Sequence, residues 1–265
     1  MSNTLLISLP AAKCSAPAAE APAISRRYAP GRVRALFDAM AATYGLAPWL
    51  SGGLLGRWRR QLAARLPVPV PGEAVCLVDL MAGGADLWPA LRRRLGPGLR
   101  LTAVDFSGPM LARATRHAAG PALVLLAADA LATGLPVGGA HAVTSALGLK
   151  TLAPAAYPAL AREAARLLRP GGRLLLLEAA LPARGWLRRL LPAYLGLLLP
   201  VLPVLRWLCP AAAAHGALAG YLRHGPDLAA LRHALRQAGF GQLRQQRLWP
   251  GCAVLLTAEL PGGPQ

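Results

Sequence analysis

An apolar run enters a glycine-containing turn at Val75-Cys-Leu-Val-Asp-Leu-Met-Ala-Gly-Gly-Ala-Asp86, and a helical pattern follows it. Outward from this stretch, apolar runs alternate with segments of helical periodicity. The expected strands are 75–80, 99–104, 123–127, 141–147 and 173–177, and the helices between them are 86–95, 109–119 and 154–168. The four leucines at 174–177 are apolar on both faces, as a parallel sheet covered by helices requires. The sequence therefore predicts a doubly wound, Rossmann-like α/β sheet.

The C-terminal part predicts an antiparallel hairpin. Its strands, 242–248 and 253–260, are joined by Trp249-Pro-Gly251. A turn this short permits an antiparallel pair, whereas a parallel pair needs a crossover of about a dozen residues. Further helices are expected at 33–40, 54–66 and 227–238, with a Pro/Leu-rich helical insertion at about 182–222. We expect residues 1–27 to form a flexible tail and residues 28–265 to form one domain.

Composition and charge narrow the class of protein. The 265 residues are 55% hydrophobic and 15% charged, which excludes a disordered chain. The chain has 29 Lys and Arg against 11 Asp and Glu, a formal charge of +18 that suits nucleic acid or an anionic membrane. Because the arginines form no nucleic-acid-binding motif, we expect no nucleic-acid partner and leave peripheral membrane contact open. The four cysteines stand far apart, which predicts neither a metal site nor disulfides and favours the cytoplasm.

Acidic side chains follow three successive strands of the predicted sheet, at Asp79, Asp105 and Asp129. In a doubly wound sheet the ligand lies at the carboxyl ends of the strands, so these carboxylates are expected there. Asp105 stands 22 positions beyond Gly83, which suits a carboxylate that accepts both ribose hydroxyls, and Asp129 suits the amine of adenine. No lysine is placed to bind a phosphate. A nucleoside with a cationic sulfonium, S-adenosylmethionine (SAM), therefore fits the predicted site better than NAD. The alternative is that these acids are ordinary helix caps and surface carboxylates.

Six segments carry a more specific pattern. They are Val33-Arg-Ala-Leu-Phe-Asp-Ala-Met-Ala-Ala-Thr-Tyr44, Val104-Asp-Phe-Ser-Gly-Pro-Met-Leu111, Asp129-Ala-Leu-Ala-Thr-Gly-Leu-Pro136, Leu147-Gly-Leu-Lys-Thr-Leu152, Leu167-Leu-Arg-Pro-Gly-Gly-Arg-Leu174 and Gln237-Ala-Gly-Phe240. In this order they resemble the ubiquinone/menaquinone biosynthesis C-methyltransferases of the UbiE type. The first and fourth segments narrow the resemblance from SAM methyltransferases in general to this type. It implies a class I methyltransferase fold, with five parallel strands, a C-terminal antiparallel hairpin and SAM as cofactor.

The resemblance also implies which residues form the site. The implied SAM contacts are Asp79, Ala82, Gly83, Gly84, Asp105, Phe106, Asp129, Ala130 and Ala146. The implied catalytic residues are Tyr44, as a hydrogen-bond partner of a phenol, and Lys150, as a positive charge for a phenolate. The alternatives are a packing aromatic and a solvated loop lysine. Met81 stands where the family has a small residue, and we expect it to crowd the methionine part of SAM.

Three functions remain open at this stage. The first is C-methylation of a polyprenyl quinol of the demethylmenaquinol or ubiquinol type, whose apolar tail the Leu/Pro-rich insertion suits. The second is O- or N-methylation of another apolar small molecule, favoured by departures from the family on its substrate face at Gly45, Pro48 and Lys150-Thr151. The third is a protein of the same fold that binds without catalysis. The sequence indicates no oligomeric state.

Overall fold

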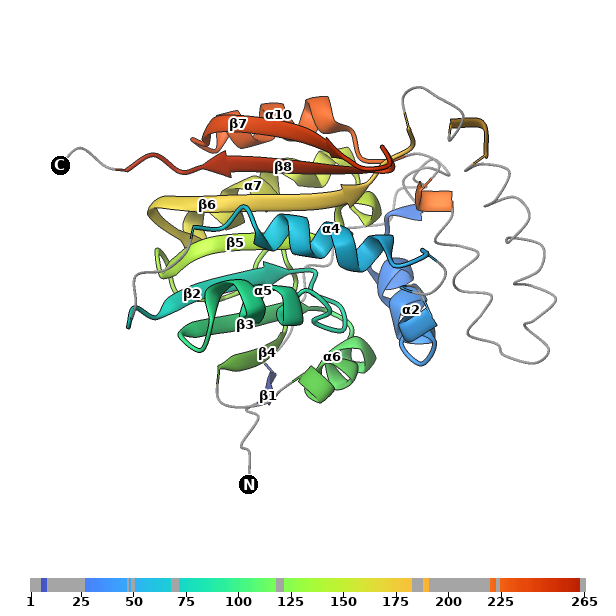
Figure 1. The fold of residues 1–265 in the computed structure, drawn as a ribbon, viewed down its shortest axis with the longest axis horizontal. Coiled ribbons are helices and arrows are strands. Elements are labelled where there is room, and N and C mark those ends of the chain that lie inside the picture. Colours follow the sequence, from blue (N-terminus) through green and yellow to red (C-terminus); the bar gives the residue numbers. More distant parts are fainter. Residues whose placement is uncertain are drawn as a thin grey trace, which may run out of the picture.

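A computed structural model describes residues 6–8, 27–46, 48, 51–67, 72–117, 122–182, 188–190, 220–222 and 225–262. They contain one eight-stranded sheet of order β1-β4-β3-β2-β5-β6-β8-β7 (Figure 1). The strands are β1 Leu6–Ser8, β2 Val75–Leu80, β3 Leu99–Asp105, β4 Leu123–Ala127, β5 Ala140–Ala146, β6 Leu168–Ala179, β7 Gly241–Leu248 and β8 Ala253–Glu259. Strands β4, β3, β2, β5 and β6 pair in parallel, and β8 is antiparallel to β6 and β7. The predicted five parallel strands and C-terminal hairpin are confirmed.

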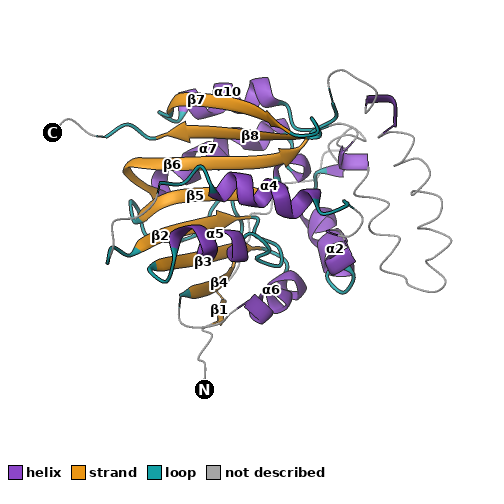
Figure 2. Ribbon diagram, viewed as in Figure 1, coloured by secondary structure: helices purple, strands orange, loops and turns teal. Residues whose placement is uncertain are grey.

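Helices cover both faces of this sheet (Figure 2). They are α2 Pro30–Met40, α4 Leu54–Ala63, α5 Trp88–Leu95, α6 Gly108–Ala114, α7 Tyr157–Leu167 and α10 Leu228–Gln237. Side chains of α4, α5 and α6 share one buried cluster with the sheet, and those of α7 and α10 share another. Because the central strands are apolar on both faces, each face needs its own helical layer to exclude water.

Element ends differ from the sequence prediction where tertiary contacts decide them. Strands β2 and β4 have the predicted bounds, whereas α4 ends at Ala63 rather than at residue 66. Helix α6 ends at Ala114 and gives way to the 3-10 turn Thr115–His117. Strand β6 begins at Leu168 instead of residue 173, because Leu168 pairs with Ala140 ahead of a shift in register. Propensity fixes the existence of these elements, and packing fixes their ends.

The two segments outside the predicted sheet are described only in part. Leu6–Ser8, within the stretch expected to be a flexible tail, forms β1 and pairs in parallel with β4 at Leu125–Ala127. The prediction of a tail over 1–27 did not anticipate this strand, and the division into tail and domain otherwise stays a prediction. Of the expected insertion at 182–222, only residues 182, 188–190 and 220–222 are described. Within the described ranges, no helix is long and apolar enough to cross a membrane.

Candidate active site

A cleft opens where the carboxyl ends of β2, β3 and β5 meet. The space among its lining atoms is about 480 Å³ and includes open solvent. The sheet contributes Asp79, Asp105 and Ala146 to its lining, together with Ala82 and Gly83 from the turn after β2. The predicted position of the site is therefore also the position of a cavity, as the crevice rule for doubly wound sheets requires.

Asp105 links the end of β3 to the turn after β2. Its Oδ2 accepts a hydrogen bond from the Gly83 backbone N–H at 2.7 Å, and its Oδ1 accepts one from the Ser107 N–H at 2.9 Å. The side chain is buried, and burial raises the pKa of its carboxyl group above the usual range. Each carboxylate oxygen has a second lone pair, so Asp105 can still accept a pair of vicinal hydroxyls.

The turn after β2 needs glycine at Gly83. Its φ is +56°, and a Cβ at this position would lie 3.0 Å from Met110 Cε. Glycine adopts this left-handed conformation without strain and lets a ligand approach the backbone. Met81 has the same φ of 56° with a long side chain that lines the cleft. A Cβ on Gly148 would come within 2.7 Å of Met81 Cβ, so Met81 fills the space that this glycine leaves open.

Asp79 is an almost fully buried acid at the end of β2, with 1% of its surface exposed. Thr144 Oγ1 donates to its Oδ1 at 2.7 Å. Burial raises the pKa of Asp79 to about 7, although the Thr144 hydrogen bond and the charge of Arg59 oppose that rise. A carboxyl group held near the middle of its titration at neutral pH, facing a cleft, is suited to a ligand that brings its own positive charge.

Arg59 is a cleft residue that the sequence analysis missed. It lies on α4 with its side chain 8% exposed, and its Nη2 is 3.4 Å from Asp86 Oδ2. Its buried Nε has no hydrogen-bond partner among the described residues. An unsatisfied guanidinium N–H in a cleft is costly, and a ligand carboxylate would satisfy it. In the sequence Arg59 is one of many arginines, so only the fold distinguishes it.

Helix α2 forms the outer wall of the cleft. Arg34 Nε donates to the Phe106 carbonyl oxygen at 2.7 Å, and the Ser107 hydroxyl hydrogen-bonds Asp38 Oδ1. These contacts hold α2 over the end of β3, where its Phe37 lines the cavity. The segment 33–44, which narrows the family resemblance, therefore lies against the site.

Tyr44 lies in the cleft and Lys150 does not. Burial raises the pKa of Tyr44 to about 12, so its hydroxyl stays protonated and can donate a hydrogen bond at neutral pH. The Lys150 side chain is 5% exposed, its Nζ is 3.2 Å from Glu178 Oε1, and Nζ also donates to the Leu147 carbonyl. Glu178 Oε2 accepts from the Lys150 backbone N–H at 2.9 Å. This pair fixes the 3-10 turn Leu149–Thr151, whose last residue lines the cleft.

The remaining predicted contacts divide into two groups. Ala82, Phe106 and Ala146 line the cleft, whereas Gly84 packs against Arg113, whose Cδ would lie 3.4 Å from an added Cβ. Ala130 is buried in the core. Neither it nor the exposed Asp129 is part of the enclosed cleft. An adenine near them would occupy the open rim beyond the cavity.

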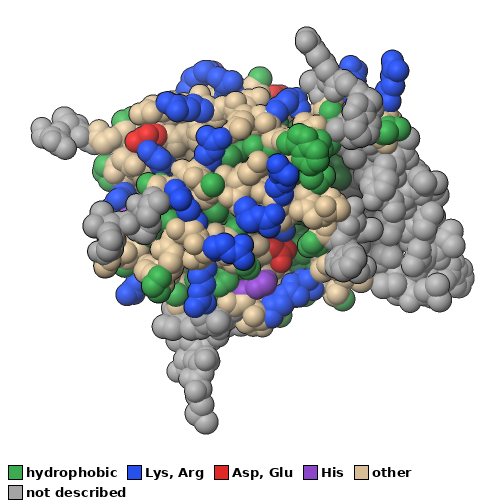
Figure 3. Space-filling view, in the orientation of Figure 1, with side chains coloured by type: hydrophobic (Ala, Val, Ile, Leu, Met, Phe, Trp, Pro, Cys, Tyr) green, Lys and Arg blue, Asp and Glu red, His purple; other side chains and the backbone are tan. Residues whose placement is uncertain are grey.

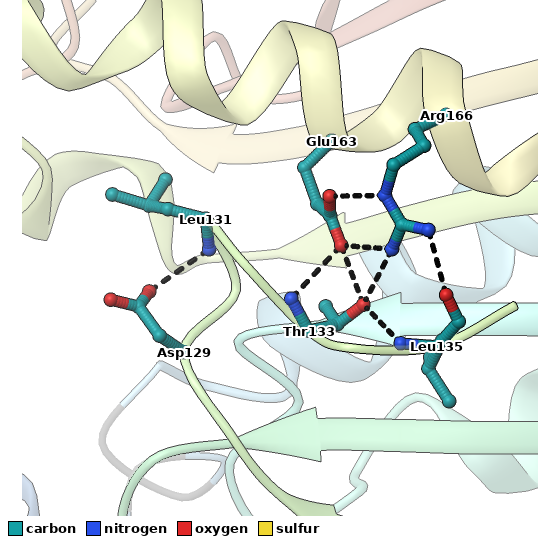
Figure 4. A network of polar contacts seen from close by, with 6 residues as sticks. All are labelled: Asp129, Leu131, Thr133, Leu135, Glu163 and Arg166. Atoms are coloured by element: carbon teal, nitrogen blue, oxygen red, sulfur yellow. Dashed lines mark hydrogen bonds and ion pairs between the residues drawn. The ribbon is translucent and has the colours of Figure 1, made fainter. Parts of the chain in front are cut away.

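The loop after β4, which carries Asp129, is held from α7. Figure 4 shows the Asp129 carboxylate directed back at the Leu131 N–H, at 2.9 Å, while Glu163 and Arg166 reach the loop from the helix. Glu163 Oε1 accepts from the Thr133 N–H at 2.9 Å, and Arg166 Nη1 donates to the Leu135 carbonyl at 2.7 Å. Arg166 and Thr133 keep the pKa of Glu163 below its usual range despite burial. This ionised network fixes the loop independently of Asp129.

The cleft fits SAM on three counts: a glycine turn with a buried carboxylate for the ribose, an acid for positive charge, and a guanidinium whose Nε–H has no described partner and suits a carboxylate. Fold and site together define a SAM-dependent methyltransferase of class I. Solved structures with a similar fold include an O-methyltransferase family protein from Burkholderia thailandensis, 21% identical with TM-score 0.55, covering 91% of this chain and 63% of that one. Human N-acetylserotonin methyltransferase, solved with SAM, is 16% identical with TM-score 0.54, covering 80% and 55%.

The chain belongs to the ubiE/COQ5 methyltransferase family, whose pattern matches residues 26–258. It is 30% identical over 234 residues to the ubiquinone/menaquinone biosynthesis C-methyltransferase UbiE of Caulobacter sp. (strain K31), covering 85% of this chain and 90% of that one. It is 35% identical over 236 residues to the demethylmenaquinone methyltransferase of Mycobacterium tuberculosis (strain ATCC 25618 / H37Rv), covering 88% and 94%. The predicted family and the predicted cofactor are confirmed, and the hypothesis of a binding protein without catalysis loses its support.

Proposed function

We propose that this enzyme methylates a ring carbon of a polyprenyl hydroquinone, of the demethylmenaquinol or ubiquinol type. The observation that carries this proposal is the position of α2 and the turn after it. Phe37 and Tyr44, from the segment that separates the UbiE type from other SAM methyltransferases, both line the cleft. The names of the curated relatives support the same substrate class.

Bound SAM supplies a methyl group on a positively charged sulfur, which an electron-rich ring carbon can attack in line. Asp105 and Gly83 would orient the nucleoside, while Asp79 and Arg59 would bind the charged methionine end. Tyr44, which stays protonated at neutral pH, donates a hydrogen bond to the acceptor oxygen as the phenol loses its proton and the ring gains electron density. The phenol proton would pass to water, and the new carbon–carbon bond would form as the carbon–sulfur bond breaks and S-adenosylhomocysteine leaves. The ring proton would then pass to water while the oxygen regains a proton, so that one proton is released for each methyl group transferred. The enzyme contributes mainly positioning.

For Lys150 the contacts favour an indirect role over the direct one implied by resemblance. Its ammonium is neutralised by Glu178 at 3.2 Å, and both groups are buried. A paired charge offers little to a developing phenolate. We therefore assign Lys150 as a positioning residue that acts through the turn carrying Thr151.

O- or N-methylation of a different apolar molecule is the second candidate. Pro48 and Thr151 depart from the pattern that the resemblance implies, and Thr151 lines the cleft, which favours a different acceptor. For the first candidate, we expect the protein in the cytoplasm and its polyprenyl hydroquinone acceptor in a membrane, because a polyprenyl tail is insoluble in water.

The test is methyl transfer from isotopically labelled SAM by the purified full chain. Demethylmenaquinol with a short prenyl tail is compared with small phenols and amines, and the product is located by mass spectrometry and NMR. A label on the ring carbon of the quinol supports the proposal. Label found only on oxygen or nitrogen, or only on the small molecules, would replace it with the second candidate.

A further inference from the structure

Two bulky apolar side chains are exposed at the edge of the sheet where the cleft opens. Trp249 is 62% exposed in the turn between β7 and β8, and Leu190 is 53% exposed. The register places the turn, since Leu248 pairs with Ala253, which pairs with Ala179 at the end of β6. In Figure 1 this turn and the short helical piece at 188–190 lie at the same end of the sheet. Single exposed apolar side chains are ordinary on a protein surface, so these two matter only together with the charges beside them.

Arginines surround these apolar side chains. The Arg57 guanidinium lies 4.9 Å from the centroid of the Trp249 ring. Arg247 Nη1 donates to the Gly251 carbonyl at 3.2 Å within the same turn. Arg188 and Arg189 are exposed beside Leu190. In the part of the chain that is described, none of these four arginines pairs with a carboxylate. Their charge is therefore available to a partner.

Helix α4 connects this surface to the cleft, because it carries both Arg57 and Arg59. Trp58 Nε1 donates to the Trp249 carbonyl at 2.8 Å, which fixes the turn against the middle of α4. The next residue, Arg59, lines the cleft. One helix thus carries Arg57 to the exposed surface and Arg59 into the site. Anything that binds Trp249 and Arg57 lies beside the cleft entrance.

We propose that the docking surface formed by Arg57, Trp249, Arg247, Arg188, Arg189 and Leu190 binds an anionic lipid bilayer and so presents the cleft to an acceptor dissolved in it. Figure 3 shows Lys and Arg side chains spread widely over this view of the molecule, in keeping with the +18 formal charge. Arginines bind lipid phosphates, while tryptophan and leucine enter the headgroup region. The choice of a bilayer rests on the proposed function, because only a lipid-soluble acceptor needs one.

The experiment measures sedimentation of the full chain with vesicles. Vesicles with about 30 mol% phosphatidylglycerol are compared with pure phosphatidylcholine, at about 0.1 M and about 0.5 M salt. We expect binding to the anionic vesicles, weakened by salt. Replacing two arginines (Arg57→Gln with Arg247→Gln) should weaken partitioning about 25-fold, a factor of about five per charge. Trp249→Ser should weaken it about tenfold, from lost apolar burial.

Matched controls lie at the opposite end of the sheet, where the parallel strands begin. Val137, 72% exposed, precedes β5, and the exposed Arg169 and Arg173 lie in the first half of β6. Val137→Ser and the pair Arg169→Gln with Arg173→Gln remove the same kinds of group from the other side. They should leave vesicle binding within about twofold of the unmodified chain, if the docking surface makes the contact. All variants are checked for unchanged SAM affinity by calorimetry, which shows that the fold is intact.

Several outcomes would overturn the proposal: no vesicle binding, equal binding to neutral vesicles, or control variants that lose as much as the test variants. A dimer in light scattering that the Trp249→Ser variant abolishes would assign the surface to a second copy instead. The proposed function is judged separately with the short-tailed quinol in detergent, where no bilayer is needed. Quinol methylation without vesicle binding refutes only the docking surface, and vesicle binding without methylation refutes only the proposed function.

Discussion

SAM binding should tighten as the pH rises through 7, because Asp79 must give up a proton to meet a cation. Burial raises the pKa of this carboxyl group from its ordinary 3.8 to about 7. In the free enzyme Asp79 is therefore mostly neutral at pH 6 and mostly ionised at pH 8. A positive charge placed beside it favours the ionised form and lowers its pKa in the complex.

The size of the effect follows from the ionised fraction. With a pKa of about 7, that fraction is roughly one tenth at pH 6 and nine tenths at pH 8. Affinity for SAM should therefore rise about tenfold across this interval, or about 1.4 kcal/mol. The stability of the free protein has the opposite pH dependence. Since the folded pKa is raised, the contribution of Asp79 to stability is fully present below pH 3.8 and is lost as the pH rises through about 7.

Isothermal calorimetry at pH 6, 7 and 8, in two buffers of different protonation enthalpy, measures both the affinity and the protons released. We expect release of about half a proton at pH 7. In the Asp79→Asn variant the pH dependence should disappear, and its midpoint of thermal unfolding at pH 8 should rise. S-adenosylhomocysteine, which lacks the sulfonium charge, should show a weaker dependence. The reasoning is refuted if the Kd for SAM is the same at pH 6 and pH 8, or if Asp79→Asn keeps the slope.

Three further substitutions test the other roles. Asp105→Ala should weaken SAM binding about 100-fold or more, from two lost charged hydrogen bonds, with cooperative unfolding retained by circular dichroism; unchanged affinity would reject the ribose assignment. Arg59→Gln should weaken SAM and S-adenosylhomocysteine equally, by about tenfold or more, since both carry the carboxylate; a loss confined to one ligand contradicts this. Lys150→Met should cost about 3–5 kcal/mol of stability in urea unfolding by leaving Glu178 buried and unpaired, and the double variant with Glu178→Leu should recover much of it. A single variant as stable as the unmodified chain would show that the pair fixes nothing.

The sequence predicts the sheet well because local pattern and tertiary environment agree there. Strands β2 and β4 are apolar runs bounded by turns, and their observed ends are the predicted ones. The Gly83–Asp105 pair was also predictable, since both residues sit next to strand ends whose pairing is fixed by the topology. Helix ends were less predictable because they depend on packing.

The roles of Arg59 and Lys150, which the sequence alone does not give, depend on contacts between elements that are far apart along the chain. Arg59 enters the cleft only because α4 packs beside α5 near Asp86. Lys150 turns to Glu178 only because β5 and β6 are neighbours in the sheet. Neither partner can be chosen from spacing along the chain, because Asp86 lies 27 positions from Arg59 and Glu178 lies 28 positions from Lys150, with no local pattern that links them. The predicted contacts of Asp129 and Ala130 at the open rim remain predictions.

Backbone strain and unpaired polar groups are concentrated at the carboxyl ends of the parallel strands, and the binding of a ligand there explains this. Of the four described non-glycine residues with positive φ, three, Met81, Ala85 and Leu147, lie in the turns after β2 and β5. The same edge holds two carboxyl groups with raised pKa and the unpartnered Nε of Arg59. Each feature costs stability in the free protein, and such features persist where function requires them. A ligand with one amine, one carboxylate and a positive sulfur relieves the electrostatic part of that cost. SAM should therefore raise the midpoint of thermal unfolding more than its neutral-sulfur product does at equal ligand concentration, because tighter binding stabilises the folded state more.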